Sequence, residues 1–276
     1  MCSCSKKAET PSKKPTVLVT IAPYAYFVDR IAGDTLDIQT LIPPGTNLHI
    51  YEPTPKEVKK SIDAAVWFRI EEPIEKRVVE AIREQNPKQK IINLQDGLTL
   101  LGEEETHELT PCQGHDHGAY DLHTWLSPKN TLIQAKLITS TLVSLFPENA
   151  QLYEKNAETL FADLKALDQD LEKELAPFKG DALLVSHPAL SYFCHNYGLI
   201  QLSVECEGKD PRPKDVEEII KKAEAYSVRC VFLQQGFNNR GAQIIGQKLG
   251  LPIYRIDPYD RDYIRNMRQI AEYITQ

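Results

Sequence analysis

The chain has 276 residues, a length that favours two domains and allows a proper core without disulfide or metal staples. Its net charge of -7 argues against nonspecific nucleic-acid binding and makes cations more natural partners. No apolar run approaches the ~20 residues of a membrane-spanning helix, and no pair of cysteines beyond the N-terminal tail has the CxxC spacing of a thiolate zinc site.

The N-terminal residues form a polar stretch rich in Lys, Pro and Ser, which predicts a disordered tether over residues 1–15. The stretch has no apolar h-region that would indicate a signal peptide. A chain that opens on Cys2 and a flexible tether is typical of a mature bacterial lipoprotein with Met1 added for expression. A cytosolic protein with a ragged start is the alternative, and the tail alone does not decide between the two.

Residues 16–146 alternate between strand and helix patterns, which predicts βαβ units and a parallel sheet. Short β-rich runs predict strands over 16–21, 36–41, 64–68 and 90–94. Helices are expected over 23–32 and 74–85, and a third begins at Pro55, where Thr54 is a suitable cap. Pro43-Pro44-Gly45 forces a loop, and that loop carries His49 towards the Pro55 helix.

The segment from Gly102 to Asp121 interrupts the alternation. It carries several acidic residues and three histidines, His107, His115 and His117. One interpretation is a solvated flexible loop, and the other is a loop that collects metal ions weakly. Both interpretations can hold together.

A long helix is predicted in the middle of the chain, over residues 147–178. It carries an apolar stripe at spacings of three and four, formed by Tyr153, Ala157, Leu160, Leu164, Leu167 and Leu171. About 29 helical residues would span ~44 Å, which suits a rigid connector between two lobes. The stripe covers too few heptads to favour a coiled-coil dimer.

The second half repeats the alternation, so residues 179–276 form a second α/β lobe after the N-terminal lobe of 16–146 and the linking helix of 147–178. Strands are predicted over 182–185, 201–206, 230–233 and 253–256, and helices over 189–197, 216–225, 239–249 and 263–274. A further helix, over 130–145, belongs to the N-terminal lobe, where Ser127 and Pro128 suit its start. Cys194 and Cys206 allow a disulfide, but two small buried thiols are the favoured interpretation.

Three histidines occupy positions that suit metal ligands. His49 and His123 each precede a helix, and His187 ends an apolar strand. Imidazole is a common ligand of Zn(II), and a carboxylate would complete a four-coordinate site. Asp257 follows the last predicted strand, and ligands of open α/β sheets collect beyond the carboxyl ends of strands. Two of these four residues lie in each lobe, so the site is expected in the cleft between the lobes. His195, by contrast, has the pattern of an ordinary helix residue.

The motifs around these residues resemble those of the zinc/manganese solute-binding proteins of bacterial ABC importers, the ZnuA/TroA-like or cluster A-I group. The resemblance spans about residues 16 to 275. It is carried by His49-Ile50-Tyr51-Glu52-Pro53-Thr54-Pro55, by Asp121-Leu122-His123-Thr124-Trp125-Leu126-Ser127-Pro128, by His187 with Tyr192-Phe193 and Tyr197-Gly198-Leu199, and by Asp257-Pro258.

The resemblance implies a class III solute-binding protein, a C-clamp of two Rossmann-like α/β lobes with parallel sheets, joined by one long rigid backbone helix. By match, His49, His123, His187 and Asp257 become the metal ligands. Zn2+ is the expected metal because His187 supplies nitrogen where manganese-type members tend to place a carboxylate; Mn2+ and Fe2+ stay open. The resemblance also implies a monomer that hands metal to the membrane permease of an ABC importer. It would lie in the periplasm or at the outer face of the cytoplasmic membrane, and a lipid anchor on Cys2 stays open.

Several residues depart from the family pattern. Pro188 stands where many members carry Asp, so the group that would hydrogen-bond the third histidine stays open. Gln234-Gln235-Gly236-Phe237 stands where many members have Glu-Pro-Gln-Phe.

Two other functions compete with the metal receptor. A zinc hydrolase would need a base such as Glu52 or Glu205, but no HExxH signature exists, so an enzyme is not expected. The second competing function is that of an adhesin-like lipoprotein whose metal is structural.

Overall fold

The computed structural model describes residues 14–102, 120–205 and 213–276. Four features of the sequence analysis lie outside this part of the chain. They are the tether with Cys2, the predicted metal-collecting histidines His107, His115 and His117, the segment that holds them, and Cys206.

The first lobe is built on a four-stranded parallel sheet in the order β2-β1-β3-β4. Its strands are β1 (Thr16–Val19), β2 (Asp37–Thr40), β3 (Val66–Arg69) and β4 (Lys90–Asn93). Its helices are α1 (Ala22–Ala32), α2 (Pro55–Ile62), α3 (Glu75–Gln85) and α5 (Pro128–Leu145). Each strand and helix lies within a few residues of its predicted range, and Thr54 caps α2 through a full capping box with Glu57.

The second lobe repeats the same topology with the order β6-β5-β7-β8, again all parallel. Its strands are β5 (Ala182–Val185), β6 (Ile200–Ser203), β7 (Val228–Gln234) and β8 (Ile253–Ile256). Its helices are α7 (Ser191–Tyr197), α8 (Pro213–Glu224), α9 (Arg240–Leu249) and α10 (Tyr263–Thr275). In each sheet the first strand lies between the second and the third, so a crevice is expected beyond the carboxyl ends of those strands.

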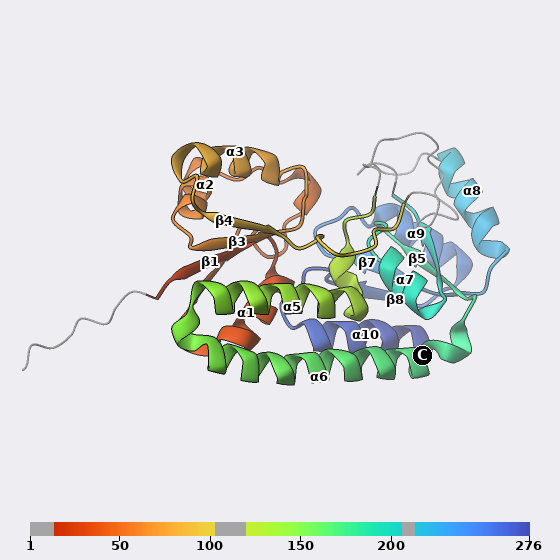
Figure 1. The fold of residues 1–276 in the computed structure, drawn as a ribbon. Coiled ribbons are helices and arrows are strands. Elements are labelled where there is room, and N and C mark those ends of the chain that lie inside the picture. Colours follow the sequence, from red (N-terminus) through yellow and green to blue (C-terminus); the bar gives the residue numbers. More distant parts are fainter. Residues whose placement is uncertain (1–13, 103–119, 206–212) are drawn as a thin grey trace, which may run out of the picture.

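The long helix α6 (Ala150–Leu175) runs along both lobes, beside α5 and α10 (Figure 1). It is shorter than predicted because 3-10 turns replace its ends, Pro147–Asn149 and Ala176–Phe178. Both turns contain a proline, which has no N–H to donate and interrupts the regular bonding of an α-helix. The predicted apolar stripe is the buried face of α6, and Leu175 extends it.

One hydrophobic core extends through both lobes. The same cluster of buried side chains contains Leu18 of β1, Leu164 of α6 and Leu183 of β5. A second, smaller cluster includes Leu184 of β5 and Val231 of β7 and belongs to the second lobe alone. The two-lobed α/β fold is confirmed, and the shared core makes α6 a packed part of both lobes. The domain boundaries at 146 and 179 stay a prediction.

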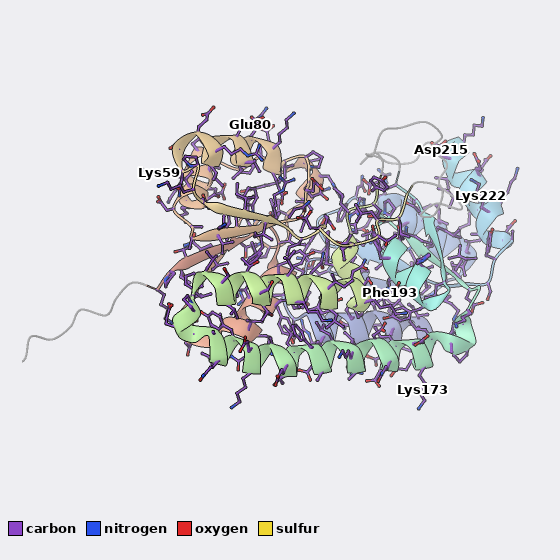
Figure 2. The ribbon with its side chains drawn as sticks, in the orientation of Figure 1. Lys59, Glu80, Lys173, Phe193, Asp215 and Lys222 are labelled. Carbon is purple, nitrogen blue, oxygen red and sulfur yellow. The ribbon has the colours of Figure 1, made fainter. Side chains whose placement is uncertain are left out.

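The division between interior and surface follows side-chain chemistry. Figure 2 shows Lys59 of α2, Glu80 of α3 and Lys173 of α6 extending outward, whereas Phe193 of α7 lies among the packed elements and is fully buried. Cys194 is a buried free thiol, in agreement with the favoured interpretation, and so is Cys230. Within the described ranges, no helix combines the length and apolar character needed to cross a membrane.

We expect Leu164→Ala to lower the free energy of unfolding by about 2–5 kcal/mol, because it leaves a cavity in the shared core. Chemical denaturation of the metal-free protein would measure this loss. Lys165→Ala on the exposed face of α6 is the matched control and should change the value by no more than about 0.5 kcal/mol. Equal losses in the two variants would contradict the assignment of this helix to the shared core.

Candidate metal centre

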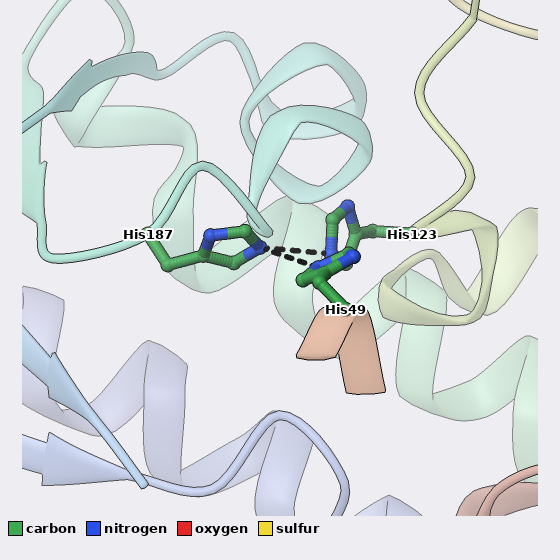
Figure 3. A group of neighbouring side chains, drawn as sticks. All are labelled: His49, His123 and His187. Carbon is green, nitrogen blue, oxygen red and sulfur yellow. Dashed lines mark hydrogen bonds between the residues drawn. The ribbon is translucent and has the colours of Figure 1, made fainter. Parts of the chain in front are cut away.

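Three imidazole rings from distant parts of the chain meet between the lobes (Figure 3). His187 Nε2 lies 3.1 Å from His49 Nε2 and 3.1 Å from His123 Nε2. One nitrogen of each ring lies within 4.8 Å of the other two, and His123 and His187 are buried while His49 is exposed. The structure therefore brings together the three histidines that the sequence analysis selected.

Local backbone structure places each histidine. His49 lies in the 3-10 turn Leu48–Ile50, where the Asn47 side chain accepts a hydrogen bond from the His49 backbone N–H at 2.9 Å. The Asp121 side chain makes the same bond to the His123 N–H at 2.8 Å. Both contacts are Asx-type turns, in which a short polar side chain bonds the backbone two residues later. His187 follows β5 directly, at the carboxyl end of the sheet.

Each ring also has a carboxylate at its Nδ1 atom. The distances are 2.8 Å from His123 to Asp121, 2.9 Å from His187 to Glu205, and 3.6 Å from His49 to Glu72. A carboxylate accepts the Nδ1 proton of a neutral imidazole, which leaves the Nε2 lone pair free for a metal ion and fixes the ring. His123 and His187 have such a hydrogen bond, whereas Glu72 lies too far from His49 for one and acts on that ring through its charge.

The sequence analysis did not assign these carboxylates. It included Asp121 only as part of a motif, considered Glu205 only as a hydrolase base, and left Glu72 out. Glu205 supplies the partner of His187 that the presence of Pro188 had left open. Glu72 follows β3 closely, so an acidic residue just beyond a predicted parallel strand was the available signal.

Two of the three separations between the ring nitrogens are close to those of a zinc site. In a tetrahedral site with Zn–N bonds of about 2.0–2.1 Å, two ligand nitrogens lie about 3.3 Å apart. The two separations of 3.1 Å are close to that value. The donor set also fits, because neutral imidazole is a preferred ligand of zinc.

Charge around His123 favours a cation. Burial opposes the imidazolium form, but the charge and hydrogen bond of Asp121, with the more distant Glu72 and Glu205, raise the pKa of His123 overall. Burial of Asp121 opposes its charged form, but the charge and hydrogen bonds of His123 lower the pKa of Asp121 overall. The carboxylates create a negative field in a buried place, where it is weakly screened.

Asp257, the predicted fourth ligand, is not part of the group of three rings. Its Oδ1 accepts the Tyr259 backbone N–H at 2.9 Å, and burial raises the pKa of its carboxyl. It borders a cavity of about 350 Å³ at the carboxyl ends of β7 and β8, which Gln235, Gly236 and Asn239 also line. Its role as a ligand stays a prediction. His195 is exposed on α7 and does not belong to the group.

His123 and His187 belong to a closed circuit of ring contacts with three aromatic side chains. Phe237 stacks on His187 with ring centroids 4.1 Å apart and packs on Tyr259 at 6.4 Å. Tyr259 packs on Trp125 at 5.6 Å, and Trp125 packs on His123 at 5.2 Å. The 5.0 Å contact between His123 and His187 closes the circuit. The sequence analysis quoted Phe237 and Trp125 within motifs but gave them no role, and it missed Tyr259.

Comparisons with known proteins point in one direction. The family model of ZnuA, a periplasmic component A of a zinc-uptake complex, matches residues 17–276. A candidate metal-binding protein of Chlamydia trachomatis serovar D is 31% identical over 270 residues, which cover 98% of this chain and 93% of that protein. The zinc-binding lipoprotein AdcA of Streptococcus pneumoniae is 28% identical; the match covers 94% of this chain and 52% of AdcA. A crystal structure of ZnuA, 28% identical, superposes with a TM-score of 0.85 over 95% of this chain and 98% of that chain.

We expect Asp121→Asn to lower the pKa of His123 towards its ordinary value near 6.5, because Asn keeps the accepting oxygen but loses the charge. Because the pKa of His123 is higher in the folded than in the unfolded protein, protonated His123 stabilises the metal-free fold. This contribution is complete below about pH 6.5 and is lost as the pH rises through the pKa of His123 in the folded protein. The pKa of Asp121 is lower in the folded than in the unfolded protein, so the ionised carboxylate also stabilises the fold. This contribution is present above the pKa of the unfolded protein and is lost as the pH falls through the pKa of the folded protein. NMR titration of the imidazoles in the metal-free protein would measure the shift.

Asp34→Asn, a change at an exposed carboxylate in the turn after α1, is the control for this titration and should leave the pKa of His123 unchanged. An identical His123 titration in wild type and Asp121→Asn would contradict the electrostatic role of Asp121.

Proposed function

Since the chain belongs to the ZnuA family of periplasmic zinc-uptake components, we propose that it captures Zn2+ between its lobes and delivers it to the permease of an ABC importer. The chain is a divalent-metal receptor of the solute-binding type and not an enzyme. The observation that carries the proposal is the convergence of three Nε2 atoms, each on a ring whose Nδ1 faces a carboxylate.

We propose His49, His123 and His187 as the ligands of the transported ion. His123 and His187 hold fixed positions because they are buried and hydrogen-bonded, whereas the His49 side chain is 33% exposed. Three nitrogen donors favour zinc over manganese, which prefers oxygen ligands. A manganese receptor of the same family is the second candidate, and the carboxylates around the rings are the feature that favours it.

We propose Asp257 as the fourth ligand. It follows β8, faces a cavity at the carboxyl ends of the strands, and uses one oxygen to accept the Tyr259 backbone N–H. A small shift of this loop or of the lobes would have to bring the other oxygen to the metal. Burial makes an uncompensated carboxylate costly, so a bound cation would relieve that cost.

Delivery, attachment and oligomeric state extend the proposal. The family is periplasmic, and AdcA of Streptococcus pneumoniae is named a lipoprotein. The Cys-bearing polar N-terminal stretch supports an anchor through Cys2 at the outer face of the cytoplasmic membrane. We further propose a monomer as the metal-carrying form and the membrane permease of an ABC importer as its partner, because the ligands come from two lobes of one chain.

We expect His123→Ala to weaken zinc binding by more than about 100-fold, because it removes a nitrogen ligand of the metal. Loss of a ligand costs more affinity than loss of a group that only hydrogen-bonds a ligand. Calorimetric competition against a chelator would measure the affinity in protein purified without a His tag. His195→Ala removes an exposed imidazole on α7 and should leave the affinity within about 2-fold. Equal affinities of the two variants would rule out the proposed site.

We expect zinc to displace manganese from the protein at equal concentrations, because the ligand set is rich in imidazole nitrogen. Competition between the two ions, followed by mass-spectrometric analysis of the bound metal, would measure the preference. The same experiment with His187→Asp, which replaces a nitrogen donor by an oxygen donor, should reduce the ratio of zinc to manganese. Equally tight binding of both ions by the wild type would favour the manganese receptor.

A further inference from the structure

Tyr259 brings a buried hydroxyl group to the metal centre that no ligand assignment uses. The residue is 7% exposed and follows β8, two positions after Asp257. Among the residues that the structure describes, its hydroxyl oxygen is buried and has no hydrogen-bond partner. Buried hydroxyl groups in proteins are nearly always hydrogen-bonded, so this donor is available to a group that enters the site.

The carboxylates of the site act on the Tyr259 hydroxyl. Burial, followed by the charges of Glu72, Asp257 and Glu205, raises the pKa of Tyr259 well above its ordinary value. Glu72 contacts His49 from the first lobe and Glu205 contacts His187 from the second. The charges that act on this hydroxyl are therefore those of Asp257 and of two carboxylates that face the site histidines, one from each lobe.

The aromatic circuit keeps the Tyr259 ring in this place. Its ring packs between Trp125 at 5.6 Å and Phe237 at 6.4 Å, and these two rings contact His123 and His187 in turn. Its backbone N–H is bonded to Asp257, and the neighbouring Pro258 carbonyl accepts the indole N–H of Trp125 at 2.8 Å. Ring and backbone are both held, so the hydroxyl has little freedom to turn to another partner.

We propose that Tyr259 is a positioning residue of the metal centre, whose hydroxyl donates a hydrogen bond to the oxygen that completes the coordination of the bound ion. The inference rests on the proposed metal-binding function. That oxygen comes either from Asp257 or from a water molecule, and the chemistry is the same in both cases. A hydrogen bond from Tyr259 fixes the direction of the oxygen lone pair and neutralises part of its charge.

The proposal predicts that Tyr259→Phe lowers zinc affinity without lowering stability. In the metal-free protein, Tyr259→Phe removes a polar atom that has no partner among the described residues, so thermal stability should rise or stay unchanged. Zinc affinity should fall by about 10-fold or more, as for other groups that orient metal ligands. A residue with a purely structural role would lower stability and affinity together or change neither.

The test compares the full-length wild type, Tyr259→Phe and Tyr263→Phe by thermal melting without metal and by zinc titration against a chelator. Tyr263→Phe is the matched control, since Tyr263 is also buried but its hydroxyl bonds Thr131 at 2.9 Å. It should lose stability and keep its zinc affinity. The absorption spectrum of the Co(II)-loaded protein should also change in Tyr259→Phe alone, because the coordinating oxygen is altered.

A double-mutant cycle with Asp257→Ala, which removes both carboxylate oxygens, identifies the source of the oxygen. If Asp257 supplies it, the loss caused by Tyr259→Phe disappears in the Asp257→Ala background; if a water supplies it, the loss persists. Zinc affinity and a cobalt spectrum unchanged by Tyr259→Phe, in a wild type that binds zinc, would overturn the inference and leave the proposed function standing. Failure of the wild type and Tyr263→Phe to bind zinc would overturn the proposed function itself.

Discussion

Contacts between carboxylates and imidazoles are the constraint on which the proposed metal centre depends. A carboxylate that accepts the Nδ1 proton of a ring leaves its Nε2 lone pair free on the opposite side. Asp121 and Glu205 do this within 2.9 Å for the two buried histidines, and Glu72 faces His49 at 3.6 Å. The order of these distances matches the order of exposure, since His49 has the longest contact and the most exposed side chain.

The same arrangement balances charge. Three carboxylates close to three neutral imidazoles leave a net negative site inside a protein whose overall charge is also -7. Buried charges are costly unless a charge of opposite sign accompanies them. A divalent cation meets that requirement, whereas in its absence a proton on His123 meets part of it. Protons and metal ions therefore compete for the same negative field.

The frame around the centre is stiff. A single core joins β1, α6 and β5, and bending α6 would break its own hydrogen bonds together with that packing. Ring contacts continue the connection through Trp125, Tyr259 and Phe237 as far as the histidines. Within such a frame, the exposed side chain of His49 is the one of the three imidazoles that can move at the lowest cost, so we expect local shifts around it and not a wide swing of the lobes.

Short-range patterns in the sequence were sufficient to determine the fold and to select the three histidines. Alternating strand and helix patterns specified two parallel α/β lobes, and the stripe from Tyr153 to Leu171 specified the buried face of α6, because both signals lie within short stretches of sequence. His49, His123 and His187 stood out because each ends a loop or strand at a predicted rigid element. Only the tertiary structure decided their partners. Glu72 and Glu205 lie in the same lobes as His49 and His187 but follow different strands, and Tyr259 of the second lobe reaches the site through ring contacts with Trp125 and Phe237. These contacts depend on how loops after different strands pack within each lobe and, for Tyr259 and Trp125, across the two lobes. No local pattern records that packing, because it reflects only neighbours along the chain.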